Sequence, residues 1–481
     1  MSQARLPPCI PLPLEHKLLV TVIEKAKDWA LMHGVGMRDK KHFTKDSIQI
    51  APFVLLPSPF PSTEFNKAVE LQPVLNELMH KVAHDVEFLE HTLQNALQVD
   101  EFTANLYDIW IKVREEGITQ SISLGLFRSD YLMQCTEANT IKQVEFNTIA
   151  SSFGAITSNL PAMSRYILRQ LGHGDLIKKM PENGALSGLC SGIIEAYDLF
   201  GVASAIIIFV VEEVSYNICD QRFHEFEISE KRPDIMIHRK TLNELYEETT
   251  VNDKKQLILE GRPVAVVYYR SGYEPSQYPS SREWDARLRV ERSSAIKCPS
   301  IQYQLAGTKK VQQTLASPGV LEKFMGGGAT TASVRDIFTG LYSLDFDESG
   351  ERAVDMALAD AERFVLKPQR EGGGNNLYGA EVREALLRMR HSRERAAYIL
   401  MERILPPLVS GYVVRPGAPV PPPLTDLVSE LGIFGVIIGT KEKIFSNRQV
   451  GHMLRTKLAD ANEGGVAAGL GALDSPFLLD L

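Results

Sequence analysis

The chain has 481 residues, 44% of them hydrophobic and 23% charged, which is typical of a globular protein with two or three domains. Its formal net charge of −8 gives no reason to expect nucleic acid or an anionic membrane as a partner, and the long apolar run Ala203–Val211 is too short to span a bilayer. The five cysteines form no C-x-x-C pair and the proline-broken N-terminus has no apolar signal segment, so we expect a cytoplasmic protein without a disulfide framework.

The first hundred or so residues are expected to be helical. Apolar residues recur at steps of three and four between Leu71 and Leu93, which indicates one amphipathic stripe. His80 and His84 lie one turn apart on this segment, a spacing that can hold a metal. No H-E-x-x-H pattern and no evident third ligand accompany them, so we interpret them as partly buried helix histidines.

From residue 120 onward the pattern changes to strands separated by helices. Thr140–Asn147 is predicted as a strand. Ala203–Val211 and Pro263–Arg270 are apolar runs suited to a parallel sheet that is covered on both faces, and Leu242–Glu260 is predicted as the crossover helix between them. This alternation predicts a small doubly wound subdomain at 205–305.

Three further strands are predicted in the C-terminal third, at Ala361–Lys367, Tyr398–Ile404 and Gly432–Gly439. Pro406–Pro423 is rich in proline and glycine and is predicted as a connector or surface loop. The mixture of strands and helices over most of the chain places the fold in the α/β class.

The segment Arg363–Gly379, RFVLKPQREGGGNNLYG, carries the most informative motif of the chain. It begins as a strand, places Lys367 at the strand end and Glu371 four residues later, and continues with three glycines. Backbone N–H groups of such a loop can approach phosphate oxygens, and the lysine adds a positive charge for the same phosphates. The alternative is a flexible surface hairpin. No P-loop, protein-kinase or dinucleotide-binding motif occurs, so the loop predicts a different nucleotide clamp.

Oxygen ligands suited to magnesium occur at two places in the sequence. Glu145 and Asn147 lie two apart on a predicted strand, so their side chains project from the same face. Alternate polar residues of this kind are usually the solvent-facing side of a strand. Here, however, the strand runs into the polar turn Thr148–Gly154, and Glu371 stands beside the glycine loop. We therefore expect these three side chains to hold a magnesium ion that bridges nucleotide phosphates.

Basic residues recur in short polar motifs. Each one taken alone is most simply a solvated side chain, but a substrate with several carboxylates needs such a set, because a guanidinium grips a carboxylate through two parallel hydrogen bonds. A second loop of small residues, EGGVAAG at 463–469, is predicted to close over a small substrate and exclude water; the alternative is a helix N-terminus packed against a crowded neighbour. The basic residues are Arg128 in FRSDY, Arg270 in YRSGY, Lys309 in AGTKK, and Arg455 and Lys457 in HMLRTK.

Several long motifs in one order carry a resemblance to a known family. They are QVEFNTIASSFG, AGTKKVQQ, RFVLKPQREGGGNNLYG, YILMERI, SELGIFGV and GHMLRTK followed by GGVAAG. Together they closely resemble the eukaryotic glutathione synthetase family of ATP-grasp ligases. The resemblance runs from about residue 120 to the end of the chain, and the N-terminal part matches less distinctively.

The resemblance implies an ATP-grasp fold, a clamp of antiparallel sheets around the nucleotide, with the 205–305 subdomain inserted for substrate binding. It implies domains at 1–204, 205–305 and 306–481, ATP and Mg²⁺ as cofactors, and a homodimer. The implied reaction adds glycine to γ-glutamylcysteine. ATP first phosphorylates the cysteinyl carboxylate, and the glycine amine then attacks the acyl phosphate to give glutathione.

The resemblance also assigns roles to individual residues. The catalytic residues would be Arg128, Lys309, Lys367 and Arg455, and the magnesium ligands Glu145, Asn147 and Glu371. The residues implied to hold ATP are Lys309, Lys367, Glu371, Gly372, Gly373, Gly374, Asn375, Asn376, Tyr378, Met401, Glu402, Arg403, Ile404, Glu430, Lys457 and Glu463. The residues implied to hold the peptide substrate are Arg128, Ile149, Ala150, Ser151, Ser152, Ser215, Tyr216, Asn217, Gln221, Arg270, Ser271, Gly272, Tyr273, Arg455, Val466 and Ala467.

Three positions depart from the family pattern. Glu463 stands where similar sequences carry aspartate, Ala150 replaces a serine, and the proline-rich segment 415–423 differs in length or sequence. None of these removes a charge from the implied centre, so an active enzyme is expected. The alternatives are a ligase of the same fold with another acceptor such as β-alanine, a small-molecule kinase, and a non-catalytic nucleotide-binding scaffold.

Overall fold

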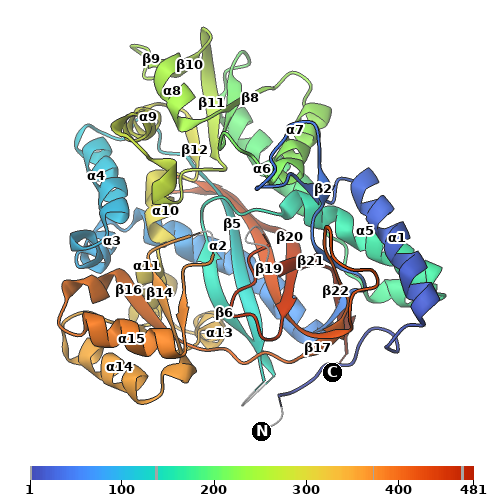
Figure 1. Ribbon diagram of the computed structural model, residues 1–481. Coiled ribbons are helices and arrows are strands. Elements are labelled where there is room, and N and C mark those ends of the chain that lie inside the picture. Colours follow the sequence, from blue (N-terminus) through green and yellow to red (C-terminus); the bar gives the residue numbers. More distant parts are fainter. Residues whose placement is uncertain (1–2, 136–138, 372, 467–470, 481) are drawn as a thin grey trace.

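The computed structural model describes residues 3–135, 139–371, 373–466 and 471–480. Within these ranges the central sheet has eight strands, in the order β18-β3-β21-β20-β19-β5-β6 with β17 also paired to β19 (Figure 1). Only the pairing of β21 with β3 is parallel among the described pairs of this sheet. The strands are β3 (Phe53–Val54), β5 (Ser123–Gln134), β6 (Thr140–Asn147), β17 (Val409–Gly411), β18 (Val413–Val414), β19 (Thr425–Gly439), β20 (Ile444–Leu458) and β21 (Gly471–Asp474).

Helices cover both faces of the central sheet. Helix α2 (Ser62–His84) packs on one face, where its Asn76 lies against Gly435 of β19. Helix α6 (Ala185–Phe200) packs on the other face, where its Gly192 lies against Val436. Successive residues of a strand point to opposite faces, so Gly435 and Val436 mark the two sides. Helix α5 (Gly154–Gln170) lies beside α6 and packs on β20. Two large apolar clusters therefore sandwich the sheet.

The N-terminal region is largely helical, as predicted, but the sequence did not reveal its short strands. The apolar stripe Leu71–Leu93 is divided between two helices, because Asp85 ends α2 and caps the next helix by accepting a hydrogen bond from the Phe88 N–H (2.9 Å). The other elements of this region are α1 (His16–Met32), β1 (Gly36–Met37), β2 (Gln49–Ile50), β4 (Ser58–Pro61), α3 (Val86–Leu93) and α4 (Glu101–Glu115); β4 pairs in parallel with β22 (Pro476–Leu479).

A second sheet of six strands lies within 205–305, where every residue is described. Strands β8, β7, β11 and β12 run parallel, as predicted for a doubly wound unit. The predicted crossover helix Leu242–Glu260 is wrong beyond Glu248: α8 ends there, and β9 and β10 form antiparallel hairpins that lead into β11. The elements are β7 (Ile206–Val210), α7 (Ile218–Lys231), β8 (Met236–Lys240), α8 (Leu242–Glu248), β9 (Thr249–Val251), β10 (Leu257–Leu259), β11 (Arg262–Tyr269), α9 (Ser281–Arg292) and β12 (Ile296–Cys298).

A third, antiparallel sheet contains the glycine motif. Apart from residue 372, its segment is described throughout, and its strand order is β13-β16-β14-β15. Helices α14 and α15 pack on it around a core of their own, at the lower left in Figure 1. The elements are β13 (Leu341–Ser343), α14 (Glu348–Ala359), β14 (Phe364–Pro368), β15 (Leu377–Tyr378), α15 (Ala380–Met389) and β16 (Tyr398–Glu402); α10 (Ile301–Ala306), α11 (Lys309–Leu315), α12 (Val320–Met325) and α13 (Ala329–Ile337) precede them.

Several predicted elements change at their ends. Residues 361–363 of the predicted strand Ala361–Lys367 form a 3₁₀ turn, and Gly432–Gly439 is only the second half of the longer β19. The predicted connector Pro406–Pro423 contains β17 and β18, which join it to the central sheet. The α/β class is confirmed. The domain limits at 204 and 305 stay a prediction, and the central sheet takes strands from both outer ranges.

Candidate active site

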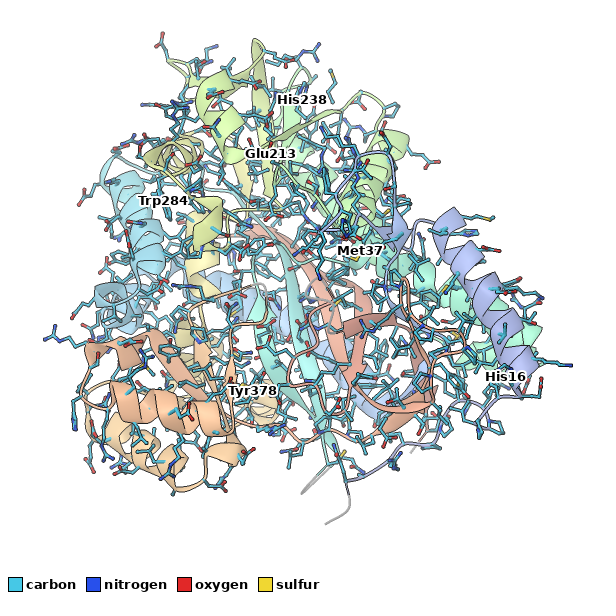
Figure 2. The ribbon with its side chains drawn as sticks, in the orientation of Figure 1. His16, Met37, Glu213, His238, Trp284 and Tyr378 are labelled. Atoms are coloured by element: carbon cyan, nitrogen blue, oxygen red, sulfur yellow. The ribbon has the colours of Figure 1, made fainter. Side chains whose placement is uncertain are left out.

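A cavity of about 830 Å³ lies where the central sheet and the four-stranded sheet meet. Tyr378 of β15, labelled in Figure 2, lines it from the four-stranded sheet, and Glu430 of β19 lines it from the central sheet. Most of the site residues expected from the sequence line this one cavity: Arg128, Glu145, Asn147, Ile149, Ala150, Ser152, Tyr216, Tyr273, Lys367, Glu371, Gly373, Asn376, Tyr378, Met401, Glu402, Arg403, Ile404, Glu430, Arg455, Lys457 and Glu463.

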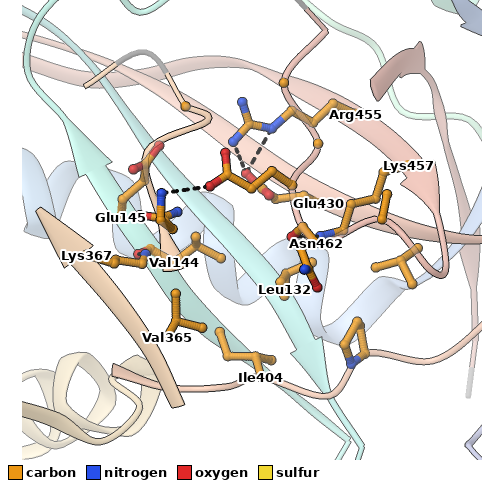
Figure 3. A pocket seen from close by; sticks show the side chains of 18 of the residues that line it. Leu132, Val144, Glu145, Val365, Lys367, Ile404, Glu430, Arg455, Lys457 and Asn462 are labelled. Carbon is orange, nitrogen blue, oxygen red and sulfur yellow. Dashed lines mark hydrogen bonds and ion pairs between the residues drawn. The ribbon is translucent and has the colours of Figure 1, made fainter. Parts of the chain in front are cut away.

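Strand register brings the charged residues of the central sheet together. Glu430 of β19 stands directly opposite Arg455 of β20, and the Arg455 Nε donates to a Glu430 carboxylate oxygen at 2.9 Å (Figure 3). On β5 and β6, Asp130 stands opposite Glu145 and Arg128 opposite Asn147. These residues alternate along their strands, so their side chains share the face that borders the cavity.

Asp130 is fully buried and forms the centre of this charged face. Arg128 donates from Nε and Nη2 to its two carboxylate oxygens, at 2.6 and 2.8 Å. Gly432 of β19 lies opposite Asp130, and a Cβ at that position would lie 2.8 Å from both Asp130 Oδ1 and Arg128 Cδ. Gly432, the first glycine of the SELGIFGV motif, therefore leaves room for the Arg128–Asp130 ion pair.

Lys309 joins two of the expected magnesium ligands. Its Nζ lies 3.1 Å from Glu145 Oε2 and 2.9 Å from Glu371 Oε1. Burial alone would lower the pKa of Lys309, but the attraction of the two carboxylates outweighs burial and raises that pKa. Burial raises the pKa of Glu371; the Lys309 charge opposes this rise, and the negative charge of Glu145 adds to it. The two carboxylates therefore approach closely enough to repel each other and to share one cation.

Lys367 lies beside this cluster at the end of β14. Its Nζ donates to the Val144 carbonyl at 2.9 Å, and its side chain is buried. Burial lowers the pKa of Lys367, and the attraction of Glu145 offsets this only in part. In Figure 3, Lys367 and Glu145 lie on one side of the cavity, with Val365 and Ile404 nearby, and Arg455 and Lys457 lie on the other.

The donor set of the three expected ligands fits magnesium. Glu145 and Glu371 offer carboxylate oxygens that already converge on one ammonium group, and Asn147 offers an amide oxygen on the same cavity wall. No group of three or more His, Cys, Asp or Glu side chains in the described ranges is arranged as a metal site. Magnesium commonly takes only one or two protein carboxylates and completes its shell with water and phosphate oxygens, so this small set is sufficient.

The two glycine-containing loops contact each other. Glu463 accepts hydrogen bonds from the backbone N–H of Gly374 and from that of Asn376, the latter at 3.0 Å. Gly373 and Gly374 have φ values of +76° and +79°, a backbone conformation that favours glycine. In the second loop, Lys457 donates to the Asn462 carbonyl at 2.6 Å. Two expected site residues, Gly372 and Ala467, lie outside the described residues.

A buried ion pair joins the loop after β6 to the six-stranded sheet. Arg270 Nη2 lies 2.8 Å from Asp220 Oδ2 and 3.0 Å from Ser152 Oγ. Asp220 also accepts from the backbone N–H groups of Phe153 and Ala155, both at 2.9 Å, at the start of α5. With the Ile156 N–H at 3.4 Å, four backbone and side-chain donors converge on one buried carboxylate.

The comparisons with known proteins agree with this geometry. Residues 16–478 match the family model described as "Eukaryotic glutathione synthase, ATP binding domain". The chain is 44% identical to the glutathione synthetase of Rattus norvegicus and 42% identical to that of Xenopus laevis, in each case over 96% of this chain and 98% of the relative. It is 39% identical to the chloroplastic glutathione synthetase of Arabidopsis thaliana, over 97% and 86%.

The chain belongs to the eukaryotic glutathione synthase family. A solved structure of a glutathione synthetase-like effector from Globodera pallida has the same fold, with a TM-score of 0.78 and 24% identity over 97% of this chain and 98% of that chain. The family resemblance and the ATP-grasp type of α/β fold expected from the sequence are thereby confirmed.

Some residues that the family resemblance singled out do not line the cavity. Arg239 of β8 donates to Ser215 Oγ at 3.0 Å and to Gln221 Oε1 of α7 at 2.6 Å, so these two belong to one polar cluster beside β8. Ser151 donates to the Leu126 carbonyl at 3.1 Å. The described residues of this group, expected in the site but not lining the cavity, are Lys309, Gly374, Asn375, Ser151, Ser215, Asn217, Gln221, Arg270, Ser271, Gly272 and Val466.

The sequence does not single out several other residues in or beside the cavity. Asp130 stands in the quoted FRSDY motif, two residues after Arg128, and that alternate spacing could have identified it. The apolar end of the cavity carries no motif and follows only from the fold; it is lined by Leu132, Cys135, Val144, Val365 and Leu405, together with Gln3, Ala4 and Pro406.

Proposed function

We propose that this protein joins glycine to the cysteinyl carboxylate of γ-L-glutamyl-L-cysteine and forms glutathione at the expense of ATP. Family membership makes it an ATP-dependent ligase of glutathione biosynthesis. The observation that supports the site is the meeting of phosphate-handling residues, Lys367 and Glu371, with the substrate-side cations Arg128 and Arg455 around one cavity.

The reaction proceeds in two steps, with ADP as the leaving group of the first and phosphate as the leaving group of the second. A carboxylate oxygen of the peptide attacks the γ-phosphorus of ATP, and ADP leaves. The glycine amine then attacks the acyl carbon, an amide bond forms, and phosphate leaves with the former carboxylate oxygen. Phosphoryl transfer of this kind needs positioning and charge neutralisation more than covalent help from the protein.

The chain's cations neutralise the phosphates and the substrate carboxylate. Lys367 contacts the phosphates directly from the cavity wall, and the nearby Lys309 acts through Glu145 and Glu371, which it pairs. Arg128 and Arg455 also line the cavity, each held by a carboxylate and each retaining terminal N–H groups for the reacting carboxylate.

The nucleotide occupies the part of the cavity between β14–β16 and β19. Met401, Glu402, Arg403 and Ile404 contact adenine and ribose from the end of β16, where Val365 and Leu132 supply apolar neighbours. Glu430, Lys457 and the loop from Gly372 to Tyr378 contact the remainder of the nucleotide. Closure of this loop against Glu463 excludes water from the reacting groups.

A magnesium ion bound by Glu145, Asn147 and Glu371 would neutralise the phosphates of ATP and polarise the transferred group. The peptide binds on the side of the six-stranded sheet, against Tyr216 and Tyr273 and the 149–152 loop. Arg270 binds both Ser152 and Asp220, and these two contacts fix the shape of that wall.

The test is the stoichiometry of the reaction catalysed by the purified protein. With ATP, Mg²⁺, γ-glutamylcysteine and glycine, we expect equal amounts of ADP, phosphate and glutathione. A small-molecule kinase would release a stable phosphorylated product in place of free phosphate. Absence of ADP formation would identify a non-catalytic scaffold. A turnover with β-alanine at least equal to that with glycine would establish the other acceptor; one methylene is worth about 1–3 kcal/mol in such discrimination.

We further propose a cytoplasmic homodimer. Support comes from the family resemblance and from five free cysteines, none paired with another. In the described residues, helices long and apolar enough to cross a bilayer are absent. Sedimentation equilibrium of the purified protein measures the oligomeric state, and a mass of one chain, 53.6 kDa, would contradict the dimer.

A further inference from the structure

Asp130 contacts three residues that the proposed function uses, the metal ligand Asn147 and the two carboxylate-binding arginines Arg128 and Arg455. Arg128 pairs with both of its carboxylate oxygens, Asn147 Nδ2 donates to Oδ2 at 3.0 Å, and Arg455 Nη2 lies 3.5 Å from the same oxygen. The Asp130 side chain is 0% exposed and does not line the cavity. It therefore acts on the cavity only through these neighbours.

The contact with Asn147 decides which way the Asn147 amide faces. An ionised carboxylate can only accept hydrogen bonds, so the NH₂ group of Asn147 must point toward Asp130. The same NH₂ group donates to the Arg128 carbonyl at 3.4 Å, which occupies its second N–H. Oδ1 is then the side-chain atom of Asn147 left for a cation, and Asn147 lines the cavity next to Glu145.

The contact with Arg128 fixes the guanidinium in the same manner. Asp130 takes the Nε and Nη2 edge, and the Ser152 carbonyl accepts from Nη1 at 3.2 Å. Without Asp130, Arg128 would lose the carboxylate that accepts from its Nε and Nη2, and Arg455 would keep Glu430 as its carboxylate partner. One buried acid thus orients a metal ligand and two anion-binding cations.

We propose that Asp130 is a positioning residue, which orients the Asn147 amide so that its oxygen, and not its NH₂ group, faces the metal position, and which holds Arg128 and Arg455 for the reacting carboxylate. This inference rests on the proposed function, because it assigns Asp130 to the same site. Removal of a group that orients a metal ligand typically lowers metal affinity or activity by about 10- to 100-fold.

The experiment measures Mn²⁺ binding by electron paramagnetic resonance, with a non-hydrolysable ATP analogue present and without peptide or glycine. Asp130→Asn can offer NH₂ to Asn147 and allows its amide to turn, so we expect Mn²⁺ affinity to fall about 10-fold or more. The control is Asp345→Asn, which removes a carboxylate bound to Lys310 away from the cavity, and which should leave Mn²⁺ affinity within about 3-fold of wild type.

The exchange variant Asp130→Asn/Asn147→Asp separates orientation from general destabilisation. It restores one amide facing one carboxylate, with an oxygen toward the metal, so Mn²⁺ affinity should return to within about 3-fold of wild type. A wild-type affinity in Asp130→Asn, or a loss that the exchange does not repair, would overturn the inference. If Asp130→Asn fails to fold, the exchange variant decides alone by the same limits.

The outcome is distinguishable from failure of the proposed function. Mn²⁺ binding is read without glutathione formation, so a wild-type protein that binds the Mn²⁺–nucleotide complex but makes no glutathione would refute the proposed function and leave this test valid. A wild-type protein that binds no Mn²⁺–nucleotide complex would overturn both.

Discussion

The ammonium group of Lys309 lies 2.9 Å from a carboxylate oxygen of Glu371, although the two residues are 62 positions apart in the sequence. The same ammonium lies 3.1 Å from Glu145 on β6. The start of α11 is thereby joined to the glycine loop and to the central sheet. One buried cation keeps two acids together at the position where magnesium is expected.

Replacement of Lys309 should lower both the stability of the fold and the rate of catalysis, and each loss can be measured separately. Lys309→Met leaves the half-buried Glu145 and Glu371 without the cation that they share, so we expect the free energy of unfolding to fall by about 3–5 kcal/mol and kcat/KM for ATP to fall at least about 100-fold. Urea unfolding and ADP release measure the two effects.

The adjacent Lys310 provides the matched control. It is also buried, but it pairs with Asp345 and lies outside the cavity. Lys310→Met should lower stability by a similar amount without the selective loss of kcat/KM. Equal kinetic losses in the two variants would contradict a role for Lys309 in the site.

Glu463 should hold the two loops together. Glu463→Ala removes the acceptor of the Gly374 and Asn376 N–H groups, so limited proteolysis within 371–376 should become several-fold faster. The cleavage rate of Glu463→Asp, whose side chain is one methylene shorter, should lie between the rates of the wild type and of Glu463→Ala. The control is Glu381→Ala, which removes the carboxylate that accepts a hydrogen bond from the Tyr378 N–H at the end of the same loop. Unchanged cleavage in Glu463→Ala would show that the contact does not restrain the loop.

The sequence predicts the metal-binding residues of the site better than the apolar residues that line the cavity. Glu145, Asn147 and Glu371 were expected together because each offers hard oxygen ligands, and β6 has the bounds predicted for it. Asp130 was missed: its spacing from Arg128 indicates only that pair, and its contacts with Asn147 and Arg455 follow from the register of β5, β6, β19 and β20. The apolar end of the cavity likewise depends on sheet packing rather than on any motif.

The fold errors have local causes. The helix expected over Leu242–Glu260 ends at Glu248 because three β-branched residues follow, from Thr249 to Val251, and favour a strand. Glu260 and Gly261 then both adopt positive φ, +49° and +75°, as a two-residue hairpin turn requires. Mixed polar and apolar composition alone could not separate this hairpin pair from a helix.

Asp220 should be among the most important residues for stability. Asp220→Ala leaves Arg270 buried and unpaired and removes the acceptor of two backbone N–H groups at the start of α5, so we expect a loss of about 3–5 kcal/mol. Urea unfolding measures it. Asp234→Ala, which breaks the exposed pair with Arg232, should cost less than about 1 kcal/mol. Similar losses for both variants would contradict the argument.

His80 should make the protein less stable in acid. Burial, aided by the neighbouring His84, lowers the pKa of His80 from 6.5 to about 4. Between these values the unfolded chain binds a proton that the folded protein does not, so stability falls as pH falls from 6.5 to 4, by about 3 kcal/mol in total. His80→Gln should reduce the difference in unfolding free energy between pH 7.5 and 4.5 by about 2–3 kcal/mol.

The control for this prediction is Tyr303→Phe. It removes the hydroxyl that hydrogen-bonds His80 Nδ1 at 2.6 Å, without removing the titrating ring. Its loss of stability should be similar at both pH values. An unchanged pH difference in His80→Gln would show that His80 does not cause the acid sensitivity.

The central claim, that the cavity activates a peptide carboxylate by phosphorylation, is tested most directly by following an oxygen atom. γ-Glutamylcysteine labelled with oxygen-18 in its cysteinyl carboxylate is incubated with ATP, Mg²⁺, glycine and the purified protein, and the released phosphate is analysed by mass spectrometry. The account predicts one labelled oxygen in each phosphate, in an amount equal to the glutathione formed. Glutathione accompanied by unlabelled phosphate would contradict it.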